Sequence, residues 1–176
     1  MGLAGVSDAS RRTLLGSVGA ALFILGLGAL DALTRGAIDL PSLVPPFGAS
    51  TVIVFFAPGS PASRSWNLIV GHLGSALVAL AALWLLPAAP VALVGAVAVA
   101  GAGVWMAVSR SIHPPGGATA LLAVLSGREL GHGAPLLPLL AGCVLIVGVR
   151  RLLDGAIQLS RARTPSLAGE VELGER

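Results

Sequence analysis

The chain has 176 residues, of which 55% are hydrophobic and only 11% are charged, and its mean hydropathy is +0.91. A soluble domain carries about 25% charged residues, so this composition excludes an ordinary water-soluble globule. The net charge of +3 comes from arginines that flank apolar blocks, as topology-setting charges do, and therefore does not indicate a nucleic-acid partner. The single cysteine, Cys143, excludes an intrachain disulfide and a cysteine-cluster metal site.

Four segments are apolar and long enough, or nearly long enough, to cross a bilayer, which takes about 17–25 residues. They are Thr13–Leu30, Asn67–Leu86, Val91–Val108 and Pro135–Val149. Trp66 and Trp84 bracket the second segment and lie about 27 Å apart along a helix, which matches the spacing of the two interfacial aromatic belts. The same span carries small residues at every fourth position, Gly71, Ser75 and Ala79, which predicts close helix packing in lipid.

Arginines at both ends of the hydrophobic region predict the orientation of the chain. Residues 1–12 form an N-terminal segment, residues 13–151 a single transmembrane domain, and residues 152–176 a polar tail. Arg11 and Arg12 precede the first span, and Arg150 and Arg151 close the last, so the positive-inside rule places both termini in the cytoplasm. Ser10–Leu15 also looks like a twin-arginine signal, but the apolar run is long for one, and we expect the first span to be retained. A composition rich in Ala, Gly and Leu, with arginine but no lysine, favours a bacterial inner membrane.

A motif recurs at an offset of 69 residues. Pro45-Pro46-Phe47-Gly48-Ala49-Ser50 and Pro114-Pro115-Gly116-Gly117-Ala118-Thr119 each open a short apolar run between two spans. Runs of roughly 9–12 residues are too short to cross a bilayer as helices. Proline suits the first turn of a helix, so each motif predicts a half-helix that begins inside the protein. We therefore expect an all-α membrane protein with four transmembrane helices and two Pro-Pro-initiated half-helices, in repeats at about 13–86 and 91–150.

Interrupted segments at matching positions in two halves indicate the binding site of a transporter. Helix N-termini carry unpaired amides and about half a positive charge, so two that converge would bind an anion. No acidic residue lies in these central segments, which favours a small anion over a cation, and we expect no metal or cofactor. The candidate substrate-binding residues come from the motifs and their flanks: Pro46, Gly48, Ser50, Thr51, Arg64, Asn67, His72, Arg110, His113, Pro114, Pro115, Gly116, Gly117 and Thr119.

The ionisable candidates also have purely structural interpretations. Arg64 and Arg110 would equally serve as anchors of helix ends at the interface. His72 would fit a packed, neutral ring bonded to a backbone carbonyl, and His113 a cap before a turn. A buried ionisable group in a span is costly, roughly 2.5–3.5 kcal/mol on insertion scales for arginine, which keeps the functional interpretation open.

The segment Ser109–Ala120, with the first motif upstream and Asn67, Gly71 and His72 between them, resembles the HPP family of integral membrane proteins, named for its His-Pro-Pro motif. The resemblance covers about residues 13–150. It implies a four-span transporter, with His113, Pro114 and Pro115 as the signature. Relatives in plastids and cyanobacteria are associated with nitrite transport, so the resemblance makes nitrite the expected substrate.

The sequence leaves two topologies and two functions open. Re-entrant half-helices give four crossings and parallel repeats, as the family description implies, whereas broken spans give six crossings and inverted repeats. The positive-inside rule mildly favours six, because Arg64 and Arg110 then lie inside. Anion transport is the leading function and a membrane scaffold or sensor subunit the alternative, while a homo-oligomer is compatible with both. We expect no enzyme, because the chain lacks a Ser/His/Asp set, paired carboxylates and a His-Glu-x-x-His motif.

Overall fold

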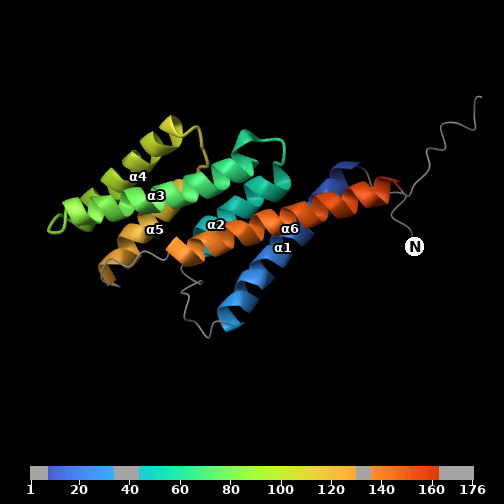
Figure 1. The fold of residues 1–176 in the computed structure, drawn as a ribbon, viewed down its shortest axis with the longest axis horizontal. Helices are drawn as coiled ribbons and strands as arrows, with labels where there is room; N and C mark the ends of the chain where they lie inside the picture. Colours follow the sequence, from blue (N-terminus) through green and yellow to red (C-terminus); the bar gives the residue numbers. More distant parts are fainter. Residues whose placement is uncertain (1–7, 34–43, 130–135, 163–176) are drawn as a thin grey trace, which may run out of the picture.

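The computed structural model describes residues 8–33, 44–129 and 136–162, and within these ranges the chain is helical and contains no strand. In chain order, the elements are α1 (Asp8–Leu33), α2 (Val44–Thr51), the π-helical turn η2 (Val52–Phe56), the 3₁₀ turn η3 (Pro61–Ser63), α3 (Ser65–Leu85), α4 (Val91–Val108), α5 (Pro115–Glu129) and α6 (Leu136–Ala162). Figure 1 shows them as one elongated helical bundle.

Four of these helices are long and apolar enough to cross a membrane, which confirms the predicted number of spans. They are Thr13–Leu30 within α1, Ser65–Leu85, Val91–Val108, and Leu136–Gln158 within α6. The last helix continues past the predicted end of its span at Val149 into the segment predicted as a polar tail. It can do so because no proline follows before Pro165, and because Arg150 and Asp154 form an (i, i+4) pair at 2.7 Å on its surface.

Two shorter apolar helices, Pro45–Phe56 and Pro115–Gly127, confirm the predicted half-helices. Each follows one span and precedes another, so the element order repeats as span, half-helix, span. α5 begins at Pro115, where the missing amide hydrogen of proline costs nothing. The first half-helix passes from α-helix into the wider π-helical turn at Val52, and the Val54 carbonyl accepts a hydrogen bond from Arg150 Nη1 at 2.6 Å.

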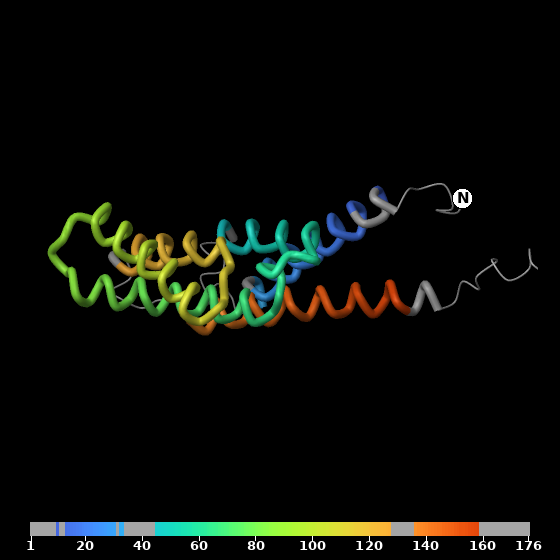
Figure 2. The backbone as a smooth tube through the Cα atoms, turned by 90° about the horizontal axis from the view of Figure 1, so that it is seen from above, coloured from blue at the N-terminus to red at the C-terminus, as the bar shows by residue number. Residues whose placement is uncertain are grey.

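The two half-helices start at the same level of the bundle and run in opposite directions, as Figures 1 and 2 both show. Ser50 of α2 bonds to His72, and a Cβ on Gly116 of α5 would lie 2.9 Å from the carbonyl oxygen of the preceding Gly71. From this level α2 and η2 lead back to the start of α3. In contrast, α5 follows α3 to its end, where Gly127 packs on Leu83.

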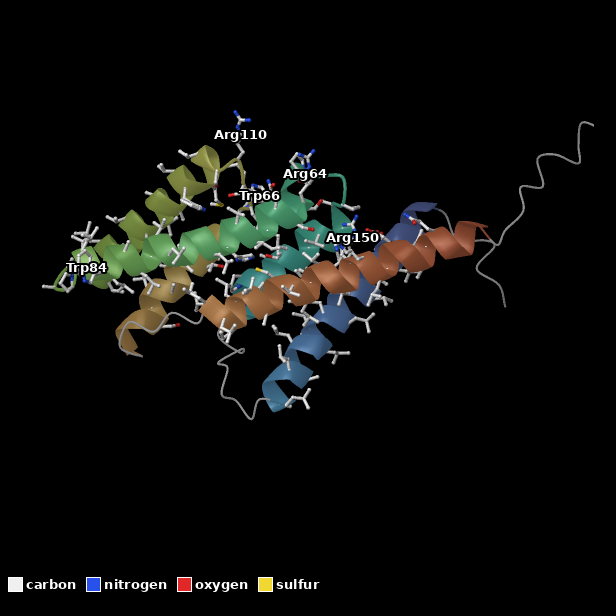
Figure 3. All side chains as sticks on the ribbon, in the orientation of Figure 1. Arg64, Trp66, Trp84, Arg110 and Arg150 are labelled. Atoms are coloured by element: carbon white, nitrogen blue, oxygen red, sulfur yellow. The ribbon has the colours of Figure 1, made fainter. Side chains whose placement is uncertain are left out.

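The connection from α4 to α5 runs from the start of α3 to the level of Gly71. Trp66 Nε1 donates to the Ser109 carbonyl at 3.3 Å, so α4 ends beside the start of α3. Arg64 and Arg110 lie at this end, and Trp84 lies at the other (Figure 3). The start of α1 belongs to the same end as the two arginines, because Gly16 packs on Phe55 of η2. These directions are those of the inverted arrangement.

Helix α3 is the centre of the bundle. Half of its span is buried, whereas only 22–28% of each of the other three spans is buried. Its predicted small-residue face is buried at Gly71, Ser75 and Ala79. On an adjoining strip, Trp105 of α4 covers Gly74, where a Cβ would clash with the indole ring. The outward faces of the helices expose leucine and valine, as expected of surfaces that contact lipid.

Candidate functional site

Four polar side chains meet about one turn inside the two half-helices, and we refer to Ser50, His72, His113 and Thr119 as the histidine cluster. Ser50 Oγ lies 2.8 Å from His72 Nε2 and 2.9 Å from His113 Nε2. The other ring nitrogen of His72 lies 2.6 Å from Thr119 Oγ1. All four side chains are at most 2% exposed, so the cluster is closed off from both water and lipid.

The cluster reflects the internal repeat. Ser50 and Thr119 occupy matching positions in the two motifs. Each hydroxyl also faces the carbonyl oxygen four residues earlier, Pro46 at 3.0 Å and Pro115 at 3.4 Å. The His72 ring lies between them and contacts one hydroxyl with each nitrogen. Each half-helix therefore places a hydroxyl against one nitrogen of the central histidine of α3.

Two glycines allow the His-Pro-Pro segment to lie directly on α3. A Cβ at Gly71 would lie 2.8 Å from His113 Cβ and 3.1 Å from the Ser111 carbonyl oxygen. A Cβ at Gly116 would lie 2.9 Å from the Gly71 carbonyl oxygen. Side-chain rotation cannot relieve these contacts, because a Cβ atom and a carbonyl oxygen move only with the backbone. A larger residue at either position would therefore displace the histidine cluster.

The acceptor of His113 determines where the hydrogens of the cluster lie. Its Nδ1 is 2.8 Å from the Ala62 carbonyl oxygen, which can only accept, so Nδ1 carries the hydrogen and Nε2 of the neutral ring accepts from Ser50. Ser50 Oγ then accepts from His72 Nε2–H, and Thr119 donates to His72 Nδ1. With neutral rings, only this order pairs all four ring nitrogens.

The surroundings of the cluster are apolar. The ring centroids of Phe47 and His72 are 5.1 Å apart, and Phe23 packs edge-on against Phe47. Among the side chains that the structure describes, the acidic one is Asp154, and it pairs with Arg150 on α6 rather than with a histidine. Within the described ranges, no three His, Cys, Asp or Glu side chains are grouped so as to hold a metal ion.

The other predicted site residues lie around the cluster in different roles. Asn67 Nδ2 donates to the Ile112 carbonyl at 3.0 Å and ties α3 to the segment before the His-Pro-Pro motif. Thr51 Oγ1 donates to the Gly48 carbonyl at 2.7 Å, within α2 itself. Arg64 is exposed and lies beside Trp66, at the end of the bundle where α3 starts (Figure 3).

The backbone of Arg110 ends α4. Its φ of 52° is left-handed, a conformation that usually falls to glycine. The Arg110 amide donates to the Ala107 carbonyl at 3.2 Å and the Ser111 amide to the Met106 carbonyl at 2.8 Å, which is the bond pattern of a Schellman motif. Its side chain is exposed and lies outside the cluster (Figure 3).

The prediction that bare amide ends converge is wrong for α5. The Gly116 amide donates to the His113 carbonyl at 2.8 Å, and the Gly117 amide donates to the Pro114 carbonyl at 3.0 Å. The Pro-Pro segment turns so tightly that its own carbonyls reach these amides. Side chains converge instead, and α2 contributes Ser50 from its last turn rather than from its N-terminus.

Two groups at the site were missed by the motif analysis. Ser75 is fully buried one turn beyond His72, and its Oγ has no hydrogen-bond partner within the described residues. It faces the first turn of α5, where a Cβ on Gly116 would lie 2.9 Å from this oxygen. The three-residue spacing from His72 on the small-residue face was a usable signal. The second group is the Ala62 carbonyl, which accepts from His113. Because it is a backbone group from a turn distant in sequence, no sequence signal indicated it.

Comparisons with known proteins agree with this architecture. A family model described as "HPP, transmembrane region" matches residues 7–163. A transmembrane protein of Dictyostelium discoideum is 42% identical over 89 residues, which cover 49% of this chain and 29% of the relative. A second transmembrane protein of the same organism is 34% identical over 119 residues, or 64% of this chain and 42% of the relative.

The chain thus spans less than half the length of these curated relatives, whose names state only that they are transmembrane proteins. No solved structure gives a significant match. The family match covers both repeats and the histidine cluster between them. The chain is therefore a member of the HPP family of integral membrane proteins, represented by the transmembrane region of that family.

Proposed function

We propose that the protein transports a small inorganic anion across the membrane, with nitrite as the substrate that the family resemblance suggests. The observation that carries the proposal is the histidine cluster, a buried polar group built from both half-helices and α3 at the centre of an apolar bundle. Ionisable groups inside a membrane are costly and mark pathways of ions or substrates. Paired half-helices at matching positions support the same interpretation.

The donors at the site suit an anion better than a cation. Ser75 offers a buried hydroxyl without a partner among the described residues, beside the positive end of the α5 dipole. The rings of His72 and His113, which can gain a positive charge, lie one turn away. We assign Arg64 and Arg110, exposed at the end where α3 starts, to the attraction of anions toward that end of the bundle.

The alternative is a non-transporting scaffold or sensor subunit, in which the two motifs serve only as packing turns. The complete hydrogen bonding of the cluster in its neutral state favours this alternative. We do not propose catalysis, because Ser50 Oγ is wholly buried among ring nitrogens and a substrate would have to displace them. We retain the bacterial inner membrane and cytoplasmic termini as proposals from composition and charge.

Flux into proteoliposomes tests the proposal. The full chain is reconstituted and nitrite uptake is compared with protein-free vesicles, which report the leak of nitrous acid. We expect uptake that falls in Ser50→Ala and His113→Ala. Ser17→Ala is a matched control, because Ser17 Oγ makes the same bond to the carbonyl four residues earlier (Thr13, 3.0 Å) on an exposed face. Wild-type flux no faster than the vesicle leak, for nitrite and other small anions, refutes transport.

A further inference from the structure

The hydrogen count of the histidine cluster has a consequence for charge. In the neutral state four hydrogens, from Thr119, His72, Ser50 and His113, make four bonds that end at the Ala62 carbonyl. No N–H of either ring is left over for an anion. A bound anion at this level would therefore place a charge beside a neutral, saturated and dry cluster, which is strongly unfavourable.

The same cluster can accept one more proton without losing a bond. If His113 Nε2 is protonated, it donates to Ser50 Oγ, and the displaced serine hydrogen can turn to the Pro46 carbonyl at 3.0 Å. If His72 Nδ1 is protonated, Thr119 accepts and its own hydrogen can turn to the Pro115 carbonyl at 3.4 Å. The repeat thus supplies one spare acceptor for each ring.

The groups around the rings offer no other counter-charge in the described structure. α1 and α2 contribute Phe23 and Phe47, the turn at η3 contributes a carbonyl, and α4 contributes Met106, whose sulfur accepts from the His113 amide at 3.4 Å. α5 contributes Thr119, and Cys143 of α6 packs in the neighbouring apolar core. A proton alone would also be costly here, whereas a proton and an anion together neutralise each other.

We propose that the histidine cluster binds one proton with each anion, so that the protein is a proton-coupled anion symporter. This rests on the proposed transport function and adds its coupling ion. The proton comes from water on the side of uptake, resides on His72 or His113 while the anion occupies the site, and returns to water on the other side. Because coupling is reciprocal, the proton strengthens anion binding as much as the anion strengthens proton binding.

Calorimetry on the purified full chain tests this directly. Nitrite is titrated into the protein in detergent, in two buffers of different ionisation enthalpy, which gives the number of protons taken up on binding. We expect about one proton per anion, and an affinity that weakens about tenfold for each unit of pH above the range in which the free cluster is protonated. The double variant His72→Gln/His113→Gln should bind without proton uptake or lose binding, whereas Ser17→Ala should keep both.

The possible results separate the two proposals. Nitrite that binds and crosses the membrane without proton uptake overturns the coupling and leaves transport standing. Proton uptake that persists in the double variant also overturns the assignment to these rings. Failure of nitrite and other small anions to bind or cross refutes transport, and the coupling falls with it. The wild-type stoichiometry needs no variant, so poor folding of the double variant does not remove the test.

Discussion

Removal of the Ser50 hydroxyl should destabilise the protein, because it leaves two buried histidine nitrogens without a partner. Ser50 Oγ lies between two histidines, at 2.8 and 2.9 Å, and both nitrogens lose their partner in Ser50→Ala. A buried polar group left unpaired costs about 1–3 kcal/mol, which sets an upper sum of about 6 kcal/mol for two. Hydrogen bonds between membrane helices average only about 0.6 kcal/mol in measured cycles, which sets a lower sum of about 1.2 kcal/mol.

We expect about 2–4 kcal/mol, because the cluster is sealed and no water can replace the hydroxyl, and because alanine regains only a few tenths through helix propensity. The free energy of unfolding is measured in mixed micelles titrated with a denaturing detergent. Ser17→Ala should stay within about 0.5 kcal/mol of wild type, as surface changes do. Ser50→Thr should recover most of the loss, because the second repeat carries threonine at this position. A Ser50→Ala variant as stable as Ser17→Ala would show that this oxygen does not stabilise the two histidines.

Three further predictions follow from the geometry around the cluster. Gly71→Ala should cost about 1–3 kcal/mol in the same unfolding assay, because its Cβ would lie 2.8 Å from His113 Cβ; wild-type stability would contradict the close approach. Arg110→Gly should stabilise the protein by about 1 kcal/mol by relieving the left-handed φ of 52°, and a loss of stability would contradict the capping role. Side-specific labelling of single cysteines at positions 35, 64, 110 and 128, in a Cys143→Ala background, should separate 64 and 110 from 35 and 128, and a common side for all four would contradict inverted repeats.

The sequence was sufficient for the elements but not for their contacts. Spans follow from apolar length, and the half-helices follow from proline at the start of runs too short to cross, so both were predictable. The left-handed turn at Arg110 was not predicted, because this conformation is usually signalled by glycine and the sequence has arginine at this position. The pairing of the α5 amides depends on how tightly the Pro-Pro segment turns, which the motif does not specify.

The sequence predicted which residues form the site better than it predicted how they interact. Ser50, His72, His113 and Thr119 were all candidates, yet their contact required knowing that the half-helices run in opposite directions from one level of α3. An anion held by two amide ends would have been independent of proton binding. The observed side-chain cluster carries hydrogens that can be rearranged. In this structure anion binding would therefore depend on histidine protonation more than on backbone dipoles.

The two histidines are not equivalent within the cluster, and the difference gives the proton a preferred route. His113 Nδ1 faces a carbonyl that can only accept, so this ring can gain or lose a proton only at Nε2, toward Ser50. His72 lies between two hydroxyls that can each donate or accept, so it can exchange tautomers without rotating. A proton that arrives at Thr119 can thus pass through His72 and Ser50 to His113, because each group hands on the hydrogen that it already donates, and the route leads from the hydroxyl of one repeat to that of the other. Since α2 and α5 lead from these hydroxyls to opposite ends of α3, inverted repeats would connect the two ends of this relay to opposite sides of the membrane.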